Sequence, residues 1–425
     1  MKPSKYNYII EYGDRAIFFN GITELFFDIP IGNREKYEAI LSSPDFYSDP
    51  FGSFIDRMKS CGFILDEETD EQELLEKKYA NLCSESQYRL MILPTYQCNL
   101  RCWYCTQEHQ DLSMTEDTLY EIRRLIENIA RDPKIKRFQL SWFGGEPLLE
   151  YEMVCSLTNY CKEMCESNET EFQCDITTNA TLLDCVKIEE LRKAGIGHYQ
   201  ITIDGKKDVH DRIKVLGKSS AFDKCLENVN MIARTTPCTL RFNYTHDNLN
   251  PTGIVEDLKT RIKPESRANI RFMIYKVWQE NAENIDFCEV EKLASLSAQE
   301  GICPELPTIG LCYADSKNFN CIFPNGMVEK CDNESPNSAR GKLSDGKIIW
   351  DKDIPAHIPA HKNSSFPCRE CRYLPVCWGP CVAKRDRMIR EKGHGCCQYE
   401  NKDLEMKQIC INRFINVRNR QLLNS

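Results

Sequence analysis

Residues 88–105, YRLMILPTYQCNLRCWYC, join an apolar segment to three closely spaced cysteines. The apolar residues 88–96 predict a buried β-strand. Cys98, Cys102 and Cys105 follow it with the spacing C-x3-C-x2-C. A loop at a strand end can bring three thiolates to one point, and thiolates are ligands of zinc and of iron–sulfur clusters. Three ligands suit a [4Fe–4S] cluster with one iron left open, because a structural cluster takes four cysteines.

Downstream of this loop, apolar strand-like segments alternate with helical patterns. Five more strands are predicted, at residues 137–143, 172–178, 198–204, 239–245 and 268–277. In the best-formed helix, Ser113 and Glu116 are an expected capping box, and the apolar face carries Leu119, Ile122, Leu125, Ile126 and Ile129. This alternation is typical of an α/β fold with a parallel sheet, open or curved into a partial (β/α)6 barrel. Sites in such folds lie at the carboxyl ends of the strands.

The first 84 residues have a different pattern and predict a small α+β domain that is winged-helix-like. Its strands are expected at residues 6–12, 16–20 and 24–29, and its helices at 34–41, 51–61 and 67–78. The polar segment 81–87 predicts its boundary. We therefore expect domains at 1–84, 85–300 and 301–410, with a C-terminal tail at 411–425.

The composition excludes several classes of protein. The chain of 425 residues has 55 Lys or Arg and 64 Asp or Glu, and its net charge of −9 gives no basic surface for nucleic acid. No apolar run reaches the roughly 18 residues of a membrane-spanning helix. The N-terminal sequence MKPSKYNYII lacks the pattern of a signal peptide, which predicts a cytoplasmic protein. Cytoplasmic thiols stay reduced, so the 24 cysteines indicate metal or cluster ligation rather than disulfides.

A second group of cysteines lies near the C-terminus. The spacing C-x2-C-x5-C-x3-C is formed by Cys368, Cys371, Cys377 and Cys381. Upstream, Cys312, Gly326 and Cys331 have the spacing C-x13-G-x4-C, with a Pro-Asn-Gly sequence that predicts a hairpin turn. Cys396 and Cys397 follow downstream. Because four thiolates also hold zinc, two zinc sites are the alternative to clusters.

The motifs together resemble a known enzyme family. The loop CNLRCWYC, with Tyr104 before its last cysteine, resembles the C-x3-C-x-φ-C signature of the radical S-adenosylmethionine (SAM) superfamily. Further marks of that superfamily are Gly144-Gly145-Glu146-Pro147, Thr177-Thr178-Asn179, Thr202-Ile203-Asp204-Gly205 and Arg241-Phe242-Asn243. The first three end successive predicted strands, and the fourth lies within the fifth strand. The resemblance covers residues 88–280.

The resemblance implies that SAM binds the open iron through its amine and carboxylate. Electron transfer then cleaves SAM to a 5′-deoxyadenosyl radical, which abstracts a hydrogen from the substrate. In this pattern Gly144, Gly145 and Glu146 would hold the methionine amine of SAM. The physical reading agrees, because glycines let the backbone approach a ligand closely and a glutamate accepts from an ammonium group.

The same resemblance assigns other residues to the SAM site. Asn179 would reach the ribose, Thr202 would lie near the methionine or the ribose, and Tyr104 would belong to the site as the aromatic residue of the loop. Relatives often place an arginine against the SAM carboxylate. Here Lys214 has that position, with Arg212 nearby. Lysine supplies charge without the bidentate fork of arginine, so the choice between them stays open.

Residues 301–410 resemble the SPASM extension of the superfamily, which carries two auxiliary [4Fe–4S] clusters. For the second auxiliary cluster the resemblance implies Cys368, Cys371, Cys377 and Cys397, with Cys396 as the alternative to Cys397. For the first it implies Cys312, Cys331 and Cys381. We expect its fourth ligand to be Cys303 rather than Cys321, because the pattern around Cys321 predicts a buried core thiol; no fourth ligand is the other option. The chain would then hold three [4Fe–4S] clusters.

The small N-terminal domain resembles the peptide-recognition element of enzymes that mature ribosomally synthesised peptides, although no motif in it is specific. In those enzymes the leader of the precursor peptide adds a strand to a sheet edge. A domain that only packs and stabilises is the alternative. The resemblance implies a ribosomal precursor peptide and an external electron donor as partners.

This layout predicts an enzyme that crosslinks a peptide, and we favour a thioether because an auxiliary cluster near the substrate can coordinate a thiolate. Carbon–carbon crosslinking and epimerisation are alternatives. An oxidase of the sulfatase-maturating type is another, in which Asp332, beside Cys331, has the position of a proposed general base. A zinc-stabilised peptide-binding protein without catalysis is the third class. The sequence leaves the peptide, the bond formed and the oligomeric state open.

Overall fold

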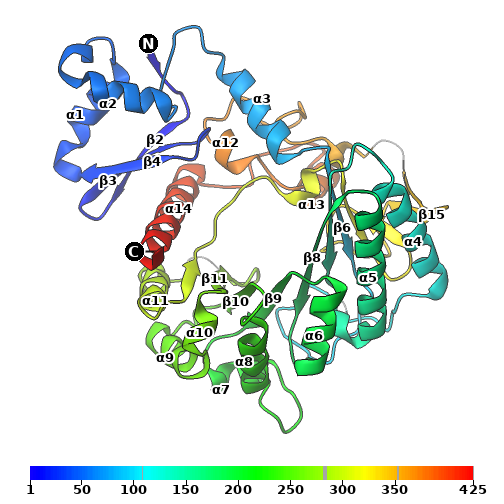
Figure 1. Ribbon diagram of the computed structural model, residues 1–425. Coiled ribbons are helices and arrows are strands. Elements are labelled where there is room, and N and C mark those ends of the chain that lie inside the picture. The colour runs from blue at the N-terminus through cyan, green and yellow to red at the C-terminus, as the bar shows by residue number, and fades with distance from the viewer. Residues whose placement is uncertain (108, 281–284, 352–353, 425) are drawn as a thin grey trace. The chain divides into compact units, whose positions relative to one another are not determined.

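The computed structural model describes residues 1–107, 109–280, 285–351 and 354–424 (Figure 1). The chain divides into two compact units. Unit 1 comprises Met1–Ser84, Thr308–Ser316 and Ile354–Ile415, and unit 2 comprises Glu85–Pro307, Lys317–Asp353 and Asn416–Ser425. The segment 301–410 therefore contributes to both units, and residues 411–424 belong to a helix rather than to a separate tail.

Unit 2 is built on a sheet whose main strands are parallel. Six strands pair in the order in which they occur along the chain: β6 (Gln87–Ile92), β7 (Arg137–Trp142), β8 (Glu171–Thr178), β9 (His198–Ile203), β10 (Cys238–Tyr244) and β11 (Ile270–Lys276). Two more parallel strands extend it, β12 (Cys303–Glu305) beside β11 and β13 (Phe319–Ile322) beside β6. The predicted α/β fold with a large parallel sheet is confirmed.

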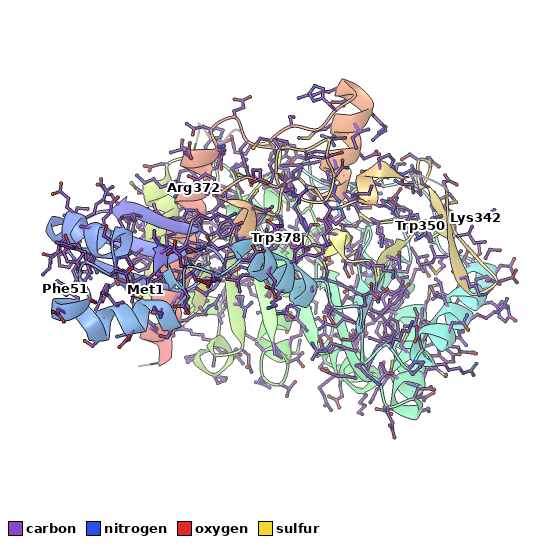
Figure 2. All side chains as sticks on the ribbon, turned by 90° about the horizontal axis from the view of Figure 1, so that it is seen from above. Met1, Phe51, Lys342, Trp350, Arg372 and Trp378 are labelled. Atoms are coloured by element: carbon purple, nitrogen blue, oxygen red, sulfur yellow. The ribbon has the colours of Figure 1, made fainter. Side chains whose placement is uncertain are left out.

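The sheet continues past β13 as an antiparallel ribbon. Its strands are β14 (Met327–Glu329), β15 (Gly341–Ser344) and β16 (Lys347–Trp350). The turn between β13 and β14 contains Gly326, whose φ of +77° lies in the region that favours glycine. Lys342 and Trp350 mark β15 and β16 in Figure 2. The predicted Pro-Asn-Gly hairpin is therefore present.

Helices alternate with the parallel strands (Figure 1). They are α4 (Glu116–Ala130), α5 (Tyr151–Ser167), α6 (Cys185–Ala194), α7 (Lys207–Ile213), α8 (Ala221–Ile232), α9 (Pro251–Arg261), α10 (Pro264–Arg267) and α11 (Phe287–Gln299). Every apolar residue predicted to face the core from α4 is buried. One row of strand side chains, including Leu140, Ile176 and Ile201, is also fully buried. This pattern gives the sheet an apolar layer against which amphipathic helices pack.

The predicted capping box at Ser113 is wrong. Helix α4 begins at Glu116, and its N-cap is Thr115, whose hydroxyl accepts from Thr118 N at 3.3 Å. Ser113 instead forms an antiparallel bridge with Thr95, and the two hydroxyl oxygens are 2.9 Å apart. This bridge holds Ser113 outside the helix and closes the loop that carries the first three cysteines.

Unit 1 contains a three-stranded antiparallel sheet in the order β2 (Asn7–Tyr12), β3 (Arg15–Asn20) and β4 (Phe26–Pro30). Helices α1 (Arg34–Ser42) and α2 (Ser48–Ser60) pack on one face through a cluster that includes Phe18 and Ile40. Helix α14 (Lys402–Asn424) packs on the other face, where Tyr8 and Ile10 cluster with Met406. The predicted N-terminal strands and helices are present.

The other elements of unit 1 are β1 (Lys2–Pro3), β5 (Ile64–Leu65), α3 (Glu71–Leu82), α12 (Leu374–Cys377) and α13 (Val382–Lys392). Helix α3 contributes Leu75 to a buried cluster with Cys368 and Trp378. Across the described part of the chain, no helix is long and apolar enough to cross a membrane.

Candidate functional site

The three cysteines of the CNLRCWYC motif lie on a loop at the carboxyl end of β6, and the Thr95–Ser113 bridge closes this loop. Cys98, Cys102 and Cys105 are partly buried. Burial raises the pKa of Cys98 to about 11, with smaller contributions that include those of the other two thiols. The three thiols are therefore close enough to influence one another electrostatically, and their role as ligands stays a prediction.

The surroundings of Cys98 suit a thiolate that ligates iron. Leu100 N donates to Cys98 Sγ at 3.4 Å, and Asn179 Nδ2 approaches the same sulfur at 3.9 Å. N–H donors to sulfur stabilise ligating thiolates and tune a cluster. Among the described residues, no three Cys, His, Asp or Glu side chains converge closely enough to share one metal ion. Three soft thiolates fit a cluster, in which each sulfur binds a different iron.

The glycine pair after β7 packs against the start of the cysteine loop. A Cβ atom on Gly145 would lie 2.0 Å from Gln97 O, and one on Gly144 would lie 2.6 Å from Thr95 O. Gly145 N donates to Thr95 O at 3.0 Å, and Glu146 N donates to Gln97 O at 2.8 Å. Because only glycine allows this approach, the pair fixes the backbone that leads into Cys98.

Glu146 is buried, with 1% of its surface exposed. Its Oε1 accepts from Leu148 N at 3.0 Å and from Thr178 Oγ1 at 2.7 Å, and its Oε2 accepts from Asn179 N at 2.8 Å. Burial raises the pKa of this carboxyl, while these hydrogen bonds act in the opposite direction. The carboxylate thus joins the ends of β7 and β8. Its predicted contact with the methionine amine stays a prediction.

Asn179 connects the end of β8 to the cysteine loop. Its Nδ2 donates to Asn99 Oδ1 at 2.9 Å, and Asn99 Nδ2 donates to Thr181 Oγ1 at 2.9 Å. Thr181 Oγ1 in turn donates to Asn179 Oδ1 at 2.6 Å. This ring of three side chains holds Asn179 beside Cys98. The sequence predicted Asn179 for the site but missed Asn99 and Thr181.

Lys214 is buried in an ion pair rather than open to solvent. Its Nζ lies 2.5 Å from Asp204 Oδ2 and 3.1 Å from Tyr104 OH, and Tyr104 OH donates to Asp204 Oδ1 at 2.5 Å. Burial acts to lower the pKa of Lys214, but Asp204 outweighs it and the pKa is raised. Arg212 is largely exposed and pairs with Asp208. The group ties the aromatic residue of the cysteine loop to the end of β9.

Sequence reasoning missed Asp204 as a member of the site. It is the third residue of the motif Thr202-Ile203-Asp204-Gly205 and directly follows β9, and a carboxylate at the end of a parallel strand was the available signal. The strand end is held from both sides: Asp204 N donates to His210 Nδ1 at 3.2 Å, and Asn248 Nδ2 donates to Asp204 O at 3.1 Å. Asp204 is fully buried in consequence.

Thr202 lies on the polar row of the sheet. It is half-buried and in register with Arg241 on β10. The same row carries Ser141 on β7, whose hydroxyl donates to Asp175 Oδ2 on β8 at 2.8 Å. At the carboxyl ends of the strands, a cavity of about 150 Å³ opens beside Tyr104, with Trp103, Asn243, Thr245 and Asn248 in its lining. The carboxyl ends of the strands therefore offer hydrogen-bonding side chains to a polar substrate or cofactor.

The cysteines of the expected second auxiliary cluster lie together in unit 1. Burial raises the pKa of Cys368 to about 12, and the thiols of Cys377, Cys371 and Cys397 add to this effect. Gln398 Nε2 donates to Cys377 Sγ at 3.3 Å. Four thiols that act on one another, with an N–H donor to sulfur, form a donor set that fits a structural cluster.

Cys396 has other neighbours. Lys392 Nζ donates to Cys396 Sγ at 3.7 Å, and this sulfur lies 3.8 Å from Met388 Sδ on α13. Cys397 acts on Cys368. The side chains of the two adjacent cysteines thus have different neighbours, and this difference favours Cys397 as the cluster ligand.

The cysteines of the expected first auxiliary cluster are divided between the units. Cys312 and Cys381 belong to unit 1, and Cys331 belongs to unit 2. Within unit 2, Cys321 on β13 is fully buried and has Cys331 nearby. Burial, Asp332 and then Cys331 raise the pKa of the Cys321 thiol.

Cys303 lies elsewhere in the sheet. It is on β12, the first strand in the order of the sheet, and six strands lie between β12 and β13 in that order. The charges that act on its thiol are Arg420, Arg271 and Glu305. The structure therefore favours Cys321 over Cys303 as the neighbour of Cys331, in contrast to the preference drawn from sequence. The sequence pattern around Cys321 predicted a buried thiol, and Cys321 is indeed buried. Burial, however, does not prevent this thiol from lying near Cys331.

Asp332 is buried, with 7% of its surface exposed, although an aspartate beside a hairpin is commonly at the surface. Its carbonyl oxygen accepts from Gln107 Nε2 at 3.1 Å. Gln107 is itself buried and belongs to the cysteine loop. Asp332 and Cys331 are therefore attached to the same loop as the first three cysteines.

Residues 92–256 match the family described as the Radical SAM superfamily. A GTP 3′,8-cyclase of Clostridium perfringens (strain SM101 / Type A) is 36% identical over 149 residues, which cover 33% of this chain and 43% of that protein. An Fe-coproporphyrin III synthase of Methanosarcina barkeri is 26% identical over 168 residues, which cover 39% of each protein. The match thus spans less than half the length of these curated relatives.

Solved structures of similar fold cover more of the chain. One is anSMEcpe with bound AdoMet and Cp18Cys peptide, with a TM-score of 0.56 and 17% identity over 79% of this chain and 99% of that one. Another is Streptococcus suis SuiB bound to precursor peptide SuiA, with a TM-score of 0.53 and 16% identity over 94% of this chain and all of that one. At this identity the likeness concerns the fold. The family match covers the segment 92–256 and includes the three-cysteine loop, so this segment is similar in sequence to the radical SAM superfamily.

Proposed function

We propose that this chain is a radical SAM enzyme that abstracts a hydrogen from a ribosomal precursor peptide and forms an intramolecular crosslink, either a thioether or a carbon–carbon bond. The observation that supports the proposal is the presence of two groups of thiols that lie within electrostatic range of one another, one on the loop after β6 and one in unit 1. The fold likeness to a protein bound to its precursor peptide, over 94% of this chain, supports a peptide as substrate.

When bound, a [4Fe–4S] cluster and SAM supply the electron and the radical that abstracts hydrogen. The chain's own residues hold and orient these groups. We propose that Cys98, Cys102 and Cys105 ligate the cluster, with donors from Leu100 N and Asn179 on the Cys98 sulfur. The loop is held from two sides, because the glycine pair fixes its start and the Lys214–Asp204 pair fixes Tyr104.

We further propose that the second auxiliary cluster is held by Cys368, Cys371, Cys377 and Cys397. For the first, we propose Cys312, Cys331 and Cys381, with Cys321 as the fourth ligand in place of Cys303. A fourth protein ligand leaves no open iron for a substrate thiolate. In that case the auxiliary clusters serve to carry away the second electron, and an external donor supplies the first. The proposed location is the cytoplasm.

The experiment that tests the proposal uses the reconstituted full chain, SAM, dithionite and the short peptide encoded beside it. Crosslinking removes two hydrogens from the peptide, so its mass falls accordingly without a new aldehyde. Epimerisation leaves the mass unchanged in water and incorporates deuterium from deuterated water. The Cys98→Ala variant, which lacks one ligand of the SAM cluster, is the control. A peptide of unchanged mass that gains no deuterium contradicts the proposal.

A second candidate function is an oxidase of the sulfatase-maturating type. The observation that favours it is the burial of Asp332 against Gln107 of the cysteine loop, because a general base beside the loop is what this reaction needs. This oxidase converts a Cys or Ser side chain to an aldehyde, which a hydrazide reagent captures. Capture by the hydrazide, abolished in Asp332→Asn, selects this function over crosslinking.

A further inference from the structure

The turn that follows β8 contains a residue in an unusual backbone conformation. Ala180 has a φ of +61°, in the left-handed region that residues with a Cβ atom rarely adopt. The residue is also fully buried. Such a conformation persists only where neighbouring groups hold it, and residues of this kind gather at functional sites. The contacts of Ala180 therefore bear on the site to which its neighbour Asn179 belongs.

A side chain of helix α8 holds this turn. Asn228 Nδ2 donates to Ala180 O at 2.8 Å and to Leu183 O at 3.1 Å. The turn leads from β8 to α6, and α8 packs against α6 (Figure 1). Asn228 is fully buried, and its Oδ1 has no hydrogen-bond partner among the described residues. The amide of Asn228 therefore forms its hydrogen bonds with this turn alone.

The turn orients the side chain of Asn179. Asn179 Oδ1 accepts from Thr181 N at 3.0 Å and from Thr181 Oγ1 at 2.6 Å. These two bonds fix the plane of the amide, whose Nδ2 lies 3.9 Å from Cys98 Sγ. Ala180 joins the two residues, so a change of its φ to a negative value would rotate Thr181 N away from Asn179 Oδ1. The left-handed conformation therefore directs the Asn179 amide toward the sulfur.

We propose that Asn228 is a positioning residue for the cluster site of Cys98, because it holds Ala180 in the conformation that directs the Asn179 amide to the Cys98 sulfur. That this sulfur ligates a cluster rests on the proposed function. An N–H donor to a ligating sulfur stabilises the additional negative charge of a reduced cluster, and so raises its reduction potential. Asn228 thus acts on that potential through the turn, from a helix outside the cysteine loop.

The first test uses the full chain without cofactors. Asn228→Leu has a similar volume and no donor, so it removes both bonds to the turn. Amide hydrogen exchange in residues 179–183 should become about fivefold faster, the effect of a lost hydrogen bond. Adding Ala180→Gly to this variant should restore most of the protection, because glycine adopts the left-handed region without a steric penalty. If Asn228→Leu alone does not fold, the added glycine should restore folding.

The second test measures the reduction potential of the cluster in the reconstituted full chain. A redox titration follows the electron paramagnetic resonance signal that SAM addition changes. Asn228→Leu should shift the midpoint to a more negative potential, and Asn179→Ala should shift it in the same direction. Both act through one contact, so the double variant should shift no further than Asn179→Ala alone. Ala180→Gly should return the midpoint of Asn228→Leu toward that of wild type.

Asn230→Leu is the matched control on the same helix. Asn230 is also buried, and its Nδ2 donates to Arg261 O at 2.7 Å, away from the turn. This variant should lose stability yet keep the exchange rates of residues 179–183 and the midpoint of wild type.

Three results overturn the inference: wild-type exchange and midpoint in Asn228→Leu, equal changes in Asn230→Leu, or no rescue by Ala180→Gly. A wild-type chain that takes up no iron contradicts the proposed function instead, and the exchange test of the turn still applies to that chain.

Discussion

Lys214 and Asp204 are 3% and 0% exposed, so water solvates neither charge. The ion pair between them takes the place of that hydration. The family resemblance placed Lys214 in the site as a candidate for the SAM carboxylate and left the choice between Lys214 and Arg212 open. The partner seen in the structure depends on where β9 ends, which no local pattern specifies. The result is a lysine whose charge holds Tyr104 in place. The sequence could therefore predict that a lysine lies near the site. It could not predict that Asp204 is its partner, because that contact depends on how the end of β9 folds.

Lys214→Met should lower the free energy of unfolding of the chain by about 3–5 kcal/mol, because it leaves Asp204 charged, buried and unpaired. The double variant Lys214→Met with Asp204→Asn should recover most of this loss, since no buried charge remains. Urea unfolding measures both. Lys207→Met is the control, because Lys207 is partly exposed and pairs with Asp211 and Asp223; its effect should stay within about 1 kcal/mol. Equal effects of the two single variants contradict the prediction.

His210 should make the fold lose stability as the solution is acidified. Burial, and after it Lys214, lowers the pKa of His210 to about 3, against an ordinary value of 6.5. Between these values the unfolded chain binds a proton that the folded chain does not, so stability rises with pH in this window and falls as pH drops through it. The slope from this group is about 1.4 kcal/mol per pH unit.

Urea unfolding of wild type and of His210→Asn between pH 7 and pH 5 isolates that contribution. The asparagine keeps an acceptor for Asp204 N and does not titrate. The variant should show the flatter profile of stability against pH. Parallel profiles for the two proteins refute a neutral buried His210.

At the scale of elements, periodicity located the six parallel strands and the helices of the N-terminal sheet closely. It did so because each strand has one apolar row and each helix one apolar face, and burial selects for both. The capping box at Ser113 failed for a different reason. A Ser-x-x-Glu sequence is a local signal, and the bridge to Thr95 is a longer-range contact that overrides it. The junctions of elements, where the site lies, were therefore the least predictable part.

Gly145→Ala should loosen the loop that carries the three cysteines. The added Cβ would lie 2.0 Å from Gln97 O, and backbone has to move to relieve this contact. Overpacking of this kind costs about 1–3 kcal/mol. After reconstitution, the variant should hold about four fewer irons per chain than wild type, which corresponds to the loss of one [4Fe–4S] cluster.

Gly32→Ala is the matched control, because nothing lies within 4 Å of a Cβ built there. It should keep the iron content of wild type. Full iron content in Gly145→Ala would mean that the glycine pair does not position the loop.

At the scale of the whole molecule, the 24 cysteines were sorted by their spacing and by the family resemblance, which group ligands most readily where these are near in sequence. The loop cysteines and the group around Cys368 are close in sequence and are gathered in the structure. Cys303 and Cys321 could not be told apart in this way, because their nearness to Cys331 depends on strand order across the sheet.

Cys321→Ala and Cys303→Ala separate the two candidates for the fourth ligand of the first auxiliary cluster. Cys321→Ala should change the electron paramagnetic resonance signal of one reduced cluster, because an iron loses its thiolate, whereas Cys303→Ala should leave all signals as in wild type. The opposite pattern would restore Cys303 as the ligand. Unchanged spectra in both variants would indicate a first auxiliary cluster with three protein ligands.

On the proposed function, the thiolates of this chain hold iron–sulfur clusters, one of which works with SAM. Iron, sulfide and zinc analysis of the reconstituted full chain tests it most directly. Three cubanes predict about twelve irons and about twelve sulfides per chain, with no stoichiometric zinc. A chain that retains zinc and takes up no iron would contradict the claim and, with it, both enzymatic functions.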